Sequence, residues 1–223
     1  PGNRAMACGA DIEYSALKIT ETGEDALAKV GDIICLADAL QADVFDQTGI
    51  VSADIVKRFK GAEMAGAIAA HPMAAEGYTH EVPVLLADYV TTDQGTGFVH
   101  IAPGHGPEDF ELAHLKHGIE VPDTVGEDGV IAEHLPLFGG MHVLRDNARI
   151  AEIMAEKGGL IGIGQLTHSY PHSWRSHAPV IYRNAAQWFV SMECLFPNFD
   201  RWQQLSIKIL SGLCPFNKLI ASK

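Results

Sequence analysis

Alternating apolar and polar residues predict several short β-strands along the first hundred residues. This spacing marks residues 12–20 and 32–36, and a Thr-Gly-Glu turn follows the first of them at residues 22–24. Two more candidates lie at residues 82–90 and 97–101, separated by a glycine-containing connection. The pattern therefore predicts a region rich in β-structure.

Three other segments have the spacing of a helix. Residues 52–61 begin with serine, a suitable N-cap, and end with glycine. Residues 107–118 begin with proline and acidic residues, and residues 146–158 begin with aspartate; both end with glycine. The expected buried stripes are Ile55, Val56 and Phe59, then Leu112, Leu115 and Ile119, then Ile150, Ile153 and Met154.

Short strands alternate irregularly with these helices, so an α+β fold suits the pattern better than a repeating βαβ sheet. Residues 180–182 and 188–191 predict two further strands, and residues 202–213 have the spacing of an amphipathic helix. No internal repeat and no low-complexity linker divides the chain.

Composition narrows the class of protein. With 223 residues, 47% hydrophobic and 20% charged, the chain has the composition of a globular protein with a substantial core. No run of about 18 apolar residues and no signal-like start is present, which leads us to expect a cytoplasmic protein with no membrane partner. The four cysteines are far apart and predict free thiols. A net charge of -12 argues against a broad nucleic-acid footprint, so contact with RNA is expected only at a short end.

The residues best suited to catalysis or binding lie in one segment, 95–109, with the sequence GTGFVHIAPGHGPED. It predicts a strand that ends at His100, a tight turn, and a helix that starts near Pro107. Such turns bring side chains and free backbone N–H groups to one point. Each residue also has an ordinary explanation, since Asp109 alone could complement the helix dipole, and His100 and His105 could be structural.

Two other kinds of site compete for these residues. The glycine pairs at residues 95–97 and 104–106 resemble part of a phosphate loop, but neither completes a P-loop or a dinucleotide motif. A metal site is the second alternative, because His168, His172 and His177 cluster in the sequence, and His114 and His117 lie one helical turn apart. Metal sites usually have a tighter ligand set with carboxylates or thiolates, so a solvated polar ribbon suits these histidines better.

Segment 91–109 as a whole resembles the signature of the editing domain of isoleucyl-tRNA synthetases. Residues 168–191 are similar to the ribbon by which that domain returns to the catalytic core, and residues 1–5 to the end of its threonine-rich peptide. Valyl and leucyl enzymes share the fold, but the Gly-His-Gly turn at residues 104–106 and the Ser-Tyr-Pro at residues 169–171 favour isoleucine.

The resemblance implies a β-barrel-like core with surrounding helices. It implies an editing domain at residues 1–160, a returning β-ribbon at residues 161–192, and a tail at residues 193–223 that matches nothing expected. No HIGH-type or KMSKS-type motif is visible, so the resemblance places ATP and Mg in a catalytic core outside this chain and implies no cofactor here. Because Ser173 and Ser176 stand where many relatives have a C-x-x-C pair, we expect no zinc in the ribbon.

The same resemblance assigns roles to individual residues. It implies that Asp109 binds the α-ammonium of a misattached valine and that His100 lines the amino-acid site and excludes isoleucine. Asn3, Gly97 and His105 are implied as substrate-binding residues. A threonine-rich peptide is expected before Pro1, and without it we expect slow deacylation.

The implied activity is hydrolysis of valine from the 3′ end of tRNA(Ile), with that tRNA and the rest of the synthetase as partners. A second sieve of this kind is needed because a binding pocket discriminates weakly between side chains that differ by one methylene. Two alternatives stay open: a non-catalytic module that only holds the tRNA acceptor end, and an unrelated metal-dependent hydrolase built on the histidines.

Overall fold

The computed structural model describes residues 1–164 and 169–185. The chain divides into two compact units, Pro1–Arg183 and Asn184–Lys223, and all the elements below belong to the first. The elements predicted at residues 188–191 and 202–213 lie outside the described residues, as does the tail at residues 193–223.

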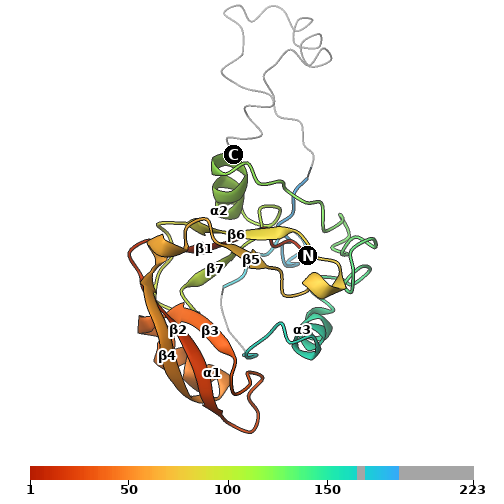
Figure 1. Ribbon diagram of the computed structural model, residues 1–223. Helices are drawn as coiled ribbons and strands as arrows, with labels where there is room; N and C mark the ends of the chain where they lie inside the picture. The colour runs from red at the N-terminus through yellow and green to blue at the C-terminus, as the bar shows by residue number, and fades with distance from the viewer. Residues whose placement is uncertain (165–168, 186–223) are drawn as a thin grey trace, which may run out of the picture. The chain divides into compact units, whose positions relative to one another are not determined.

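The first sheet has four strands in the order β5, β6, β1, β7 (Figure 1). These are β5 (Ile68–Ala70), β6 (Glu81–Leu86), β1 (Ala5–Cys8) and β7 (Phe98–Ile101). Strand β1 runs parallel to β6 and antiparallel to β7. The start of the chain and residues 98–101 are therefore adjacent although a hundred residues separate them.

The second sheet is antiparallel with strands in the order β3, β2, β4, so β2 is central and the chain crosses from one edge to the other between β3 and β4. Its strands are β3 (Ile33–Ala37), β2 (Glu13–Thr22) and β4 (Ile50–Lys60). Strand β2 buries Leu17 and Ile19, while its alternate residues Lys18 and Thr20 are exposed. This period of two is typical of a sheet with one face on the core.

The helices are short. They are α1 (Gln41–Thr48), α2 (Pro107–Asp109), which continues as the π-helix η4 (Phe110–Lys116), and α3 (Asn147–Glu156). Three 3₁₀ turns, η1 (Asp38–Leu40), η2 (Gly61–Met64) and η3 (Ala74–Glu76), connect the other elements. Within the described ranges, no helix has the length and apolar character needed to span a bilayer.

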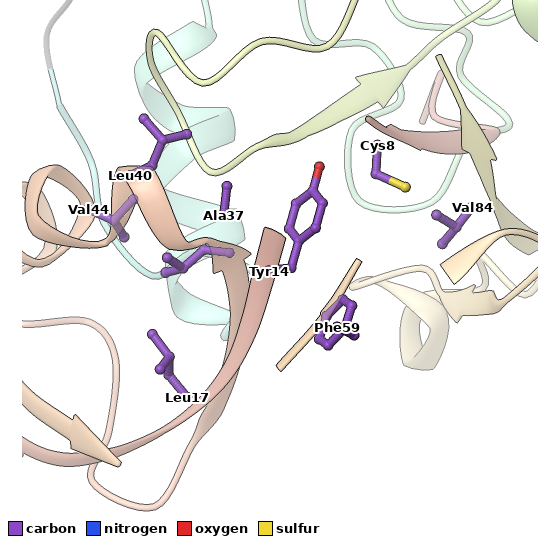
Figure 2. Packing of buried hydrophobic residues seen from close by; sticks show 9 residues of the cluster. Cys8, Tyr14, Leu17, Ala37, Leu40, Val44, Phe59 and Val84 are labelled. Carbon is purple, nitrogen blue, oxygen red and sulfur yellow. The ribbon is translucent and has the colours of Figure 1, made fainter. Parts of the chain in front are cut away.

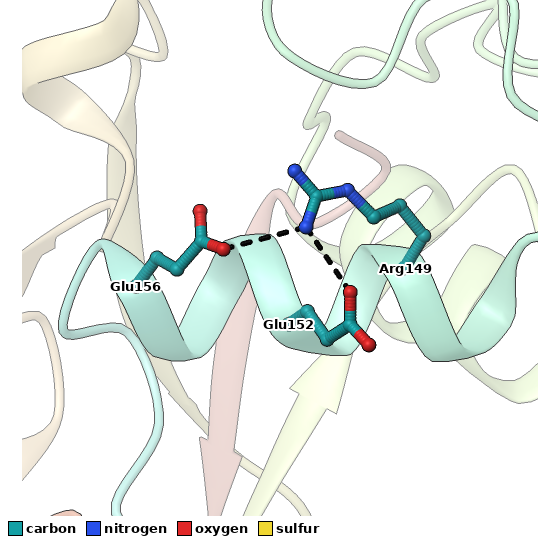
Figure 3. Close-up of polar contacts among 3 residues, drawn as sticks. All are labelled: Arg149, Glu152 and Glu156. Atoms are coloured by element: carbon teal, nitrogen blue, oxygen red, sulfur yellow. Dashed lines mark hydrogen bonds and ion pairs between the residues drawn. The ribbon is translucent and has the colours of Figure 1, made fainter.

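Helix α3 has one face on the protein and one in solvent. Ile153 is buried, whereas on the exposed face the guanidinium of Arg149 donates to Glu152 at 3.1 Å and to Glu156 at 3.3 Å (Figure 3). Ion pairs so fully in water contribute little to stability, so the buried residues hold this helix in place.

Several predicted elements are confirmed. The strands expected at residues 12–20, 32–36 and 97–101 correspond to β2, β3 and β7, and the one at residues 82–90 to the shorter β6. The helix at residues 107–118 is present as α2 and η4, and the third expected helix is α3. Gly118 and Gly158 follow the last two helices with φ of 68° and 72°, as expected of C-terminal glycines.

The helix predicted at residues 52–61 is wrong, because this segment is strand β4. It pairs with β2 along most of its length, with Ile55 opposite Leu17 and Phe59 opposite Tyr14. Phe59 is buried but Ile55 and Val56 are about half exposed, so they form no buried helical stripe. The helix lies just upstream instead, as α1, which ends at Gly49 with φ 70°.

Two other expectations differ from the structure. Residues 180–182 form no strand, since only an isolated bridge between His172 and Pro179 joins this ribbon. The content is α+β as expected, but the strands of the described residues form two open sheets and close no barrel. The proposed domain boundary at residue 160 stays a prediction.

Tyr14 joins the two sheets. Its ring stacks on Phe59 with centroids 5.9 Å apart and lies 4.7 Å from the ring of Phe98 on β7. Its hydroxyl donates to the carbonyl of Gly97 at 2.6 Å and accepts the N–H of Gly9 at 3.2 Å. Figure 2 shows Tyr14 within the largest buried cluster. A fully buried hydroxyl with both partners satisfied fixes the start of β7 against β2.

Gly97 permits this close approach. Its φ is 82°, and a Cβ there would lie 2.5 Å from the Cβ of Ala37 and 3.1 Å from the Tyr14 ring. Gly95 has a similar φ of 79° with open space around it. The two glycines therefore share a backbone requirement but differ in packing.

We predict that Gly97→Ala lowers the free energy of unfolding by about 1–3 kcal/mol more than Gly95→Ala does, because only the first substitution overpacks the core. Both variants have the cost of alanine in the left-handed region, so their difference isolates the steric contribution. Urea denaturation followed by circular dichroism measures it. Equal destabilisation of the two variants would contradict the packing described for Gly97.

Candidate functional site

A cavity of about 410 Å³ lies beside strand β7. Its lining is mostly apolar, with Asn3, His71 and His100 as its polar side chains, and it contains no lysine or arginine. The apolar and remaining lining residues are Pro1, Met6, Ala69, Ala70, Pro72, Met73, Val82, Phe98, Val99, Phe138 and Met154. A largely apolar cavity of this size with a few polar groups is typical of a small-molecule site.

The turn from β7 to α2 brings a carboxylate close enough for its charge to act on His100, which lines this cavity. The N–H of His105 donates to the carbonyl of Ala102 at 2.9 Å, which closes the turn, and Pro107 begins the helix. The Asp109 carboxylate then folds back and accepts the N–H of Ala102 at 2.8 Å through Oδ2. Asp109 therefore has a structural bond in addition to its place in the first helical turn, and this bond orients its carboxylate.

Asn3 fixes the tautomer of His100. The Nδ2 of Asn3 lies 3.0 Å from the carbonyl oxygen of Ala5 and 2.9 Å from Nδ1 of His100. A carbonyl oxygen only accepts hydrogen bonds, so the Asn3 atom that faces it must be the amide nitrogen. This Nδ2 group donates one hydrogen bond to the Ala5 carbonyl and the other to His100. Nδ1 of His100 is then unprotonated in the neutral ring, and the proton is on Nε2, where it can donate to a bound molecule.

Two opposing effects set the charge of His100. Desolvation by the surrounding protein lowers its pKa, while the negative charge of Asp109 raises it, and the net shift is downward. The residue as a whole is nevertheless exposed. At neutral pH the site thus presents a neutral imidazole under the influence of a carboxylate charge.

Asp109 is half-buried and does not line the cavity itself, although its charge acts on His100, which does. Within residues 1–164 and 169–185, no lysine, arginine or histidine forms an ion pair with it. An oriented carboxylate without a cationic partner is suited to bind a cationic group of a ligand.

The backbone of Asn3 is held from the other side. Nη1 of Arg4 donates to the carbonyls of Asn3 at 2.6 Å and Pro1 at 2.9 Å. Nε2 of His80 lies 3.0 Å from the same Asn3 oxygen and 3.1 Å from Nη1 of Arg4. Burial and the nearby Arg4 charge lower the pKa of His80, which keeps it neutral. Arg4 and His80 therefore position the residue that orients His100.

Gly97 and His105, expected to bind substrate, have other partners in the structure. Gly97 faces the core at Tyr14 and Ala37. Nδ1 of His105 donates to the carbonyl of Tyr182 at 2.9 Å, and its Nε2 then accepts from the Thr124 hydroxyl at 2.7 Å. Gly97 thus packs against the core and His105 is anchored within the turn, and the direct contact of either residue with substrate stays a prediction.

The sequence reasoning missed His71. It is 7% exposed, follows β5, and lies on the cavity wall. Its Nδ1 accepts the N–H of Met73 at 3.0 Å, and its ring stacks on Tyr78 with centroids 4.8 Å apart. Desolvation, with smaller contributions from positive groups such as Arg4, lowers its pKa to about 4. A single histidine followed by proline in an alanine-rich stretch gave no periodic signal.

The histidines considered for metal binding do not gather in the described part of the chain. No group of three His, Cys, Asp or Glu side chains suited to a metal is found there. His172 uses Nδ1 to contact the carbonyl of Tyr170 at 2.8 Å. His168 lies outside the described residues.

Comparisons with known proteins agree on one class. A family model for the leucyl-tRNA synthetase editing domain matches residues 41–136. An isoleucine–tRNA ligase of Pelagibacter ubique is 42% identical over 193 residues, covering 86% of this chain and 21% of the ligase. That of Caulobacter vibrioides is 41% identical over 218 residues, covering 90% of this chain and 22% of the ligase. The chain thus spans about a fifth of the length of these relatives.

Solved structures share the fold at low sequence identity. One described as GlLeuRS-CP1 has a TM-score of 0.56 at 12% identity, covering 74% of this chain and 80% of that chain. The P. falciparum cytosolic leucyl-tRNA synthetase editing domain has a TM-score of 0.51 at 10% identity, covering 73% and 74% of the two chains. At such identities the likeness concerns the fold alone.

We predict that Asp109→Asn lowers the pKa of His100 further, because it removes the negative charge that favours the imidazolium while keeping an acceptor for the Ala102 N–H. NMR titration of the His100 ring measures this. Glu108→Gln is the matched control and should leave the pKa of His100 unchanged. A pKa that stays constant or rises in Asp109→Asn would contradict the electrostatic coupling.

We also predict that the protein loses stability as the pH falls from about 6.5 towards 4. The folded pKa of His71 is lowered to about 4, so the unfolded chain binds a proton in this window and the folded chain does not. The stabilising contribution is present above pH 6.5. Urea midpoints across the window should fall, and His71→Phe should flatten the slope. The lowered pKa values of His80 and His100 leave a residual slope in that variant.

Proposed function

We propose that this chain, which belongs to the family of isoleucyl-tRNA synthetase editing domains, hydrolyses the ester between valine and the 3′ end of tRNA(Ile). One observation carries the proposal: the oriented carboxylate of Asp109 acts electrostatically on the imidazole of His100, which lines an apolar cavity. This arrangement offers one place for a cation and an apolar wall for an aliphatic side chain.

Asp109 is proposed to bind the α-ammonium of the valyl group. Its Oδ2 accepts the Ala102 N–H, which leaves Oδ1 for a charge-assisted hydrogen bond. Because the ester carbonyl is two bonds from the ammonium nitrogen through the α-carbon, anchoring the ammonium limits where the carbonyl can point. Positioning of this kind is a large part of the rate gain available to a hydrolase.

His100 is proposed to contact the amino-acid part of the substrate. Its Nδ1 is occupied by Asn3, so it does not accept a proton there while that bond is kept. Its Nε2–H can donate to the ester carbonyl oxygen as negative charge develops on it. The ring also narrows the site, which favours valine over the larger isoleucine.

The proposed reaction requires only water. The water oxygen bonds to the ester carbonyl carbon, the bond from that carbon to the ribose oxygen breaks, and the ribose oxygen takes a proton. The products are free valine and tRNA(Ile) with its terminal hydroxyl restored. No cofactor enters this scheme, and we place ATP and Mg in the remainder of the synthetase.

The proposed partners are the 3′ end of valyl-tRNA(Ile) and the rest of the synthetase chain, in the cytoplasm, where aminoacyl-tRNAs are made. The net charge of -12 supports contact with a short RNA end rather than with a long duplex. The relatives' length, about five times that of the aligned segment, supports a function inside a larger enzyme.

We predict that Asp109→Ala lowers the single-turnover rate of valyl-tRNA(Ile) deacylation by about a hundredfold or more, because the ammonium loses its partner and the carbonyl its direction. The assay uses this chain and a version extended upstream of Pro1 by the threonine-rich peptide, which should be faster. Circular dichroism checks folding, since the Ala102 bond is lost as well.

Glu108→Ala is the matched control for this variant, since Glu108 is exposed and precedes Asp109 on the same helical turn. It should retain the parental rate, and isoleucyl-tRNA(Ile) should be a poor substrate for both proteins. Binding of valyl-tRNA without any hydrolysis, in the chain and in its extended version, would favour a module that only holds the acceptor end.

A further inference from the structure

His71 presents one hydrogen-bond donor to the cavity that the proposed reaction does not use. Nδ1 accepts the Met73 N–H, so the proton of the neutral ring is on Nε2. Within the described residues, this Nε2 has no hydrogen-bond partner, and it is not among the fully buried unpaired atoms. His71 is 7% exposed and is one of the residues that line the cavity.

The ring that carries this donor is rigid. It stacks on Tyr78 at an interplanar angle of 23°, and His80 packs against it with centroids 5.2 Å apart. The hydroxyl of Tyr78 is itself fixed, because it donates to the carbonyl of Pro136 at 2.7 Å. A donor fixed in this way loses little conformational entropy when a ligand binds.

We propose that Nε2–H of His71 donates a hydrogen bond to an uncharged acceptor of the substrate's terminal adenosine, so that His71 is a binding residue for the 3′ nucleoside. This inference rests on the proposed function. The acceptor is a ring nitrogen of adenine or an oxygen of the ribose, which share the same chemistry.

The surroundings of His71 exclude the other parts of the substrate. A donor repels the α-ammonium, and the positive charge of Arg4 acts on the same ring, so the ammonium belongs on the Asp109 side. An aliphatic side chain would leave the N–H unpaired at a cost in free energy. A phosphate favours a cationic partner, and the cavity has no lysine or arginine in its lining.

The size of the cavity supports the same assignment. At about 410 Å³ it lies within the range of cavities that hold drug-sized ligands, and it is far larger than the isopropyl group of valine. The aromatic rings of Phe98 and Phe138 on its wall give apolar surface against which a planar base can pack. Both observations support a cavity that binds a nucleoside in addition to the amino acid.

The test is a double-mutant cycle on binding, with a valyl-adenosine in which an amide replaces the hydrolysable ester. Affinity is measured by calorimetry for the parent protein and for His71→Phe, which keeps an aromatic ring but has no donor. The same measurement is made with analogues of the probe that each lack one acceptor. In one series adenine is replaced by 1-, 3- or 7-deazaadenine, and in the other the ribose lacks its free hydroxyl or its ring oxygen. We expect His71→Phe to bind the complete probe about three- to tenfold more weakly. The analogue that lacks the acceptor of His71 should bind the parent protein and His71→Phe with equal affinity, because neither pair can form the hydrogen bond, and this equality identifies the acceptor.

NMR of the unmodified protein gives a second measurement that needs no variant. The Nε2–H resonance of His71 should shift when the complete probe binds and stay in place with the analogue that lacks the acceptor. His117→Phe, which removes an exposed imidazole, is the matched control and should bind as the parent does.

The outcomes separate this inference from the proposed function. If the parent binds the probe, but no analogue weakens that binding and the His71 resonance is unmoved, the role of His71 is overturned while the editing site stands. If the parent neither binds the probe nor deacylates valyl-tRNA(Ile), both proposals fail.

Discussion

The bond from the Tyr14 hydroxyl to the Gly97 carbonyl is the constraint on which the site depends. It joins the second sheet to the first in the middle of the largest buried cluster, with the Tyr14 ring between Phe59 and Phe98. His100 lies three residues beyond Gly97 on the same short strand, so a shift at Gly97 moves His100 with it. Only glycine combines the required φ with so close an approach to the tyrosine ring.

From that fixed strand, short backbone contacts place the three polar groups of the site. Asn3 reaches His100 because β1 pairs with β7, opposing Met6 to His100. Asp109 reaches the same strand end because its carboxylate accepts the Ala102 N–H across the turn. Short contacts with the backbone support each group, which is how a site keeps its geometry without a ligand.

Local signals made part of this predictable from the sequence. Pro107 and the acids after it mark a helix start in a few residues, so the sequence predicts a strand, a turn and a helix, with His100 in the strand and Asp109 in the helix, as in the structure. Strand β4 was not predictable in this way, because Ile55, Val56 and Phe59 suit a helix or a strand and only pairing with β2 decides. His71 was missed because its contacts with Met73 and Tyr78 follow from the fold of the segment, and no spacing marks them.

The distribution of charge around the cavity follows from desolvation. His71, His80 and His100 all have lowered pKa values, with burial as the first cause and Arg4 acting on the first two. Their rings are therefore neutral donors at neutral pH, and the negative charge nearby belongs to Asp109. In the proposed reaction such an arrangement would separate two tasks, since the carboxylate would attract the ammonium while imidazole donors would bind neutral acceptors. If the histidines were protonated they would compete for Asp109, and the ammonium would lose the partner that directs its ester toward water.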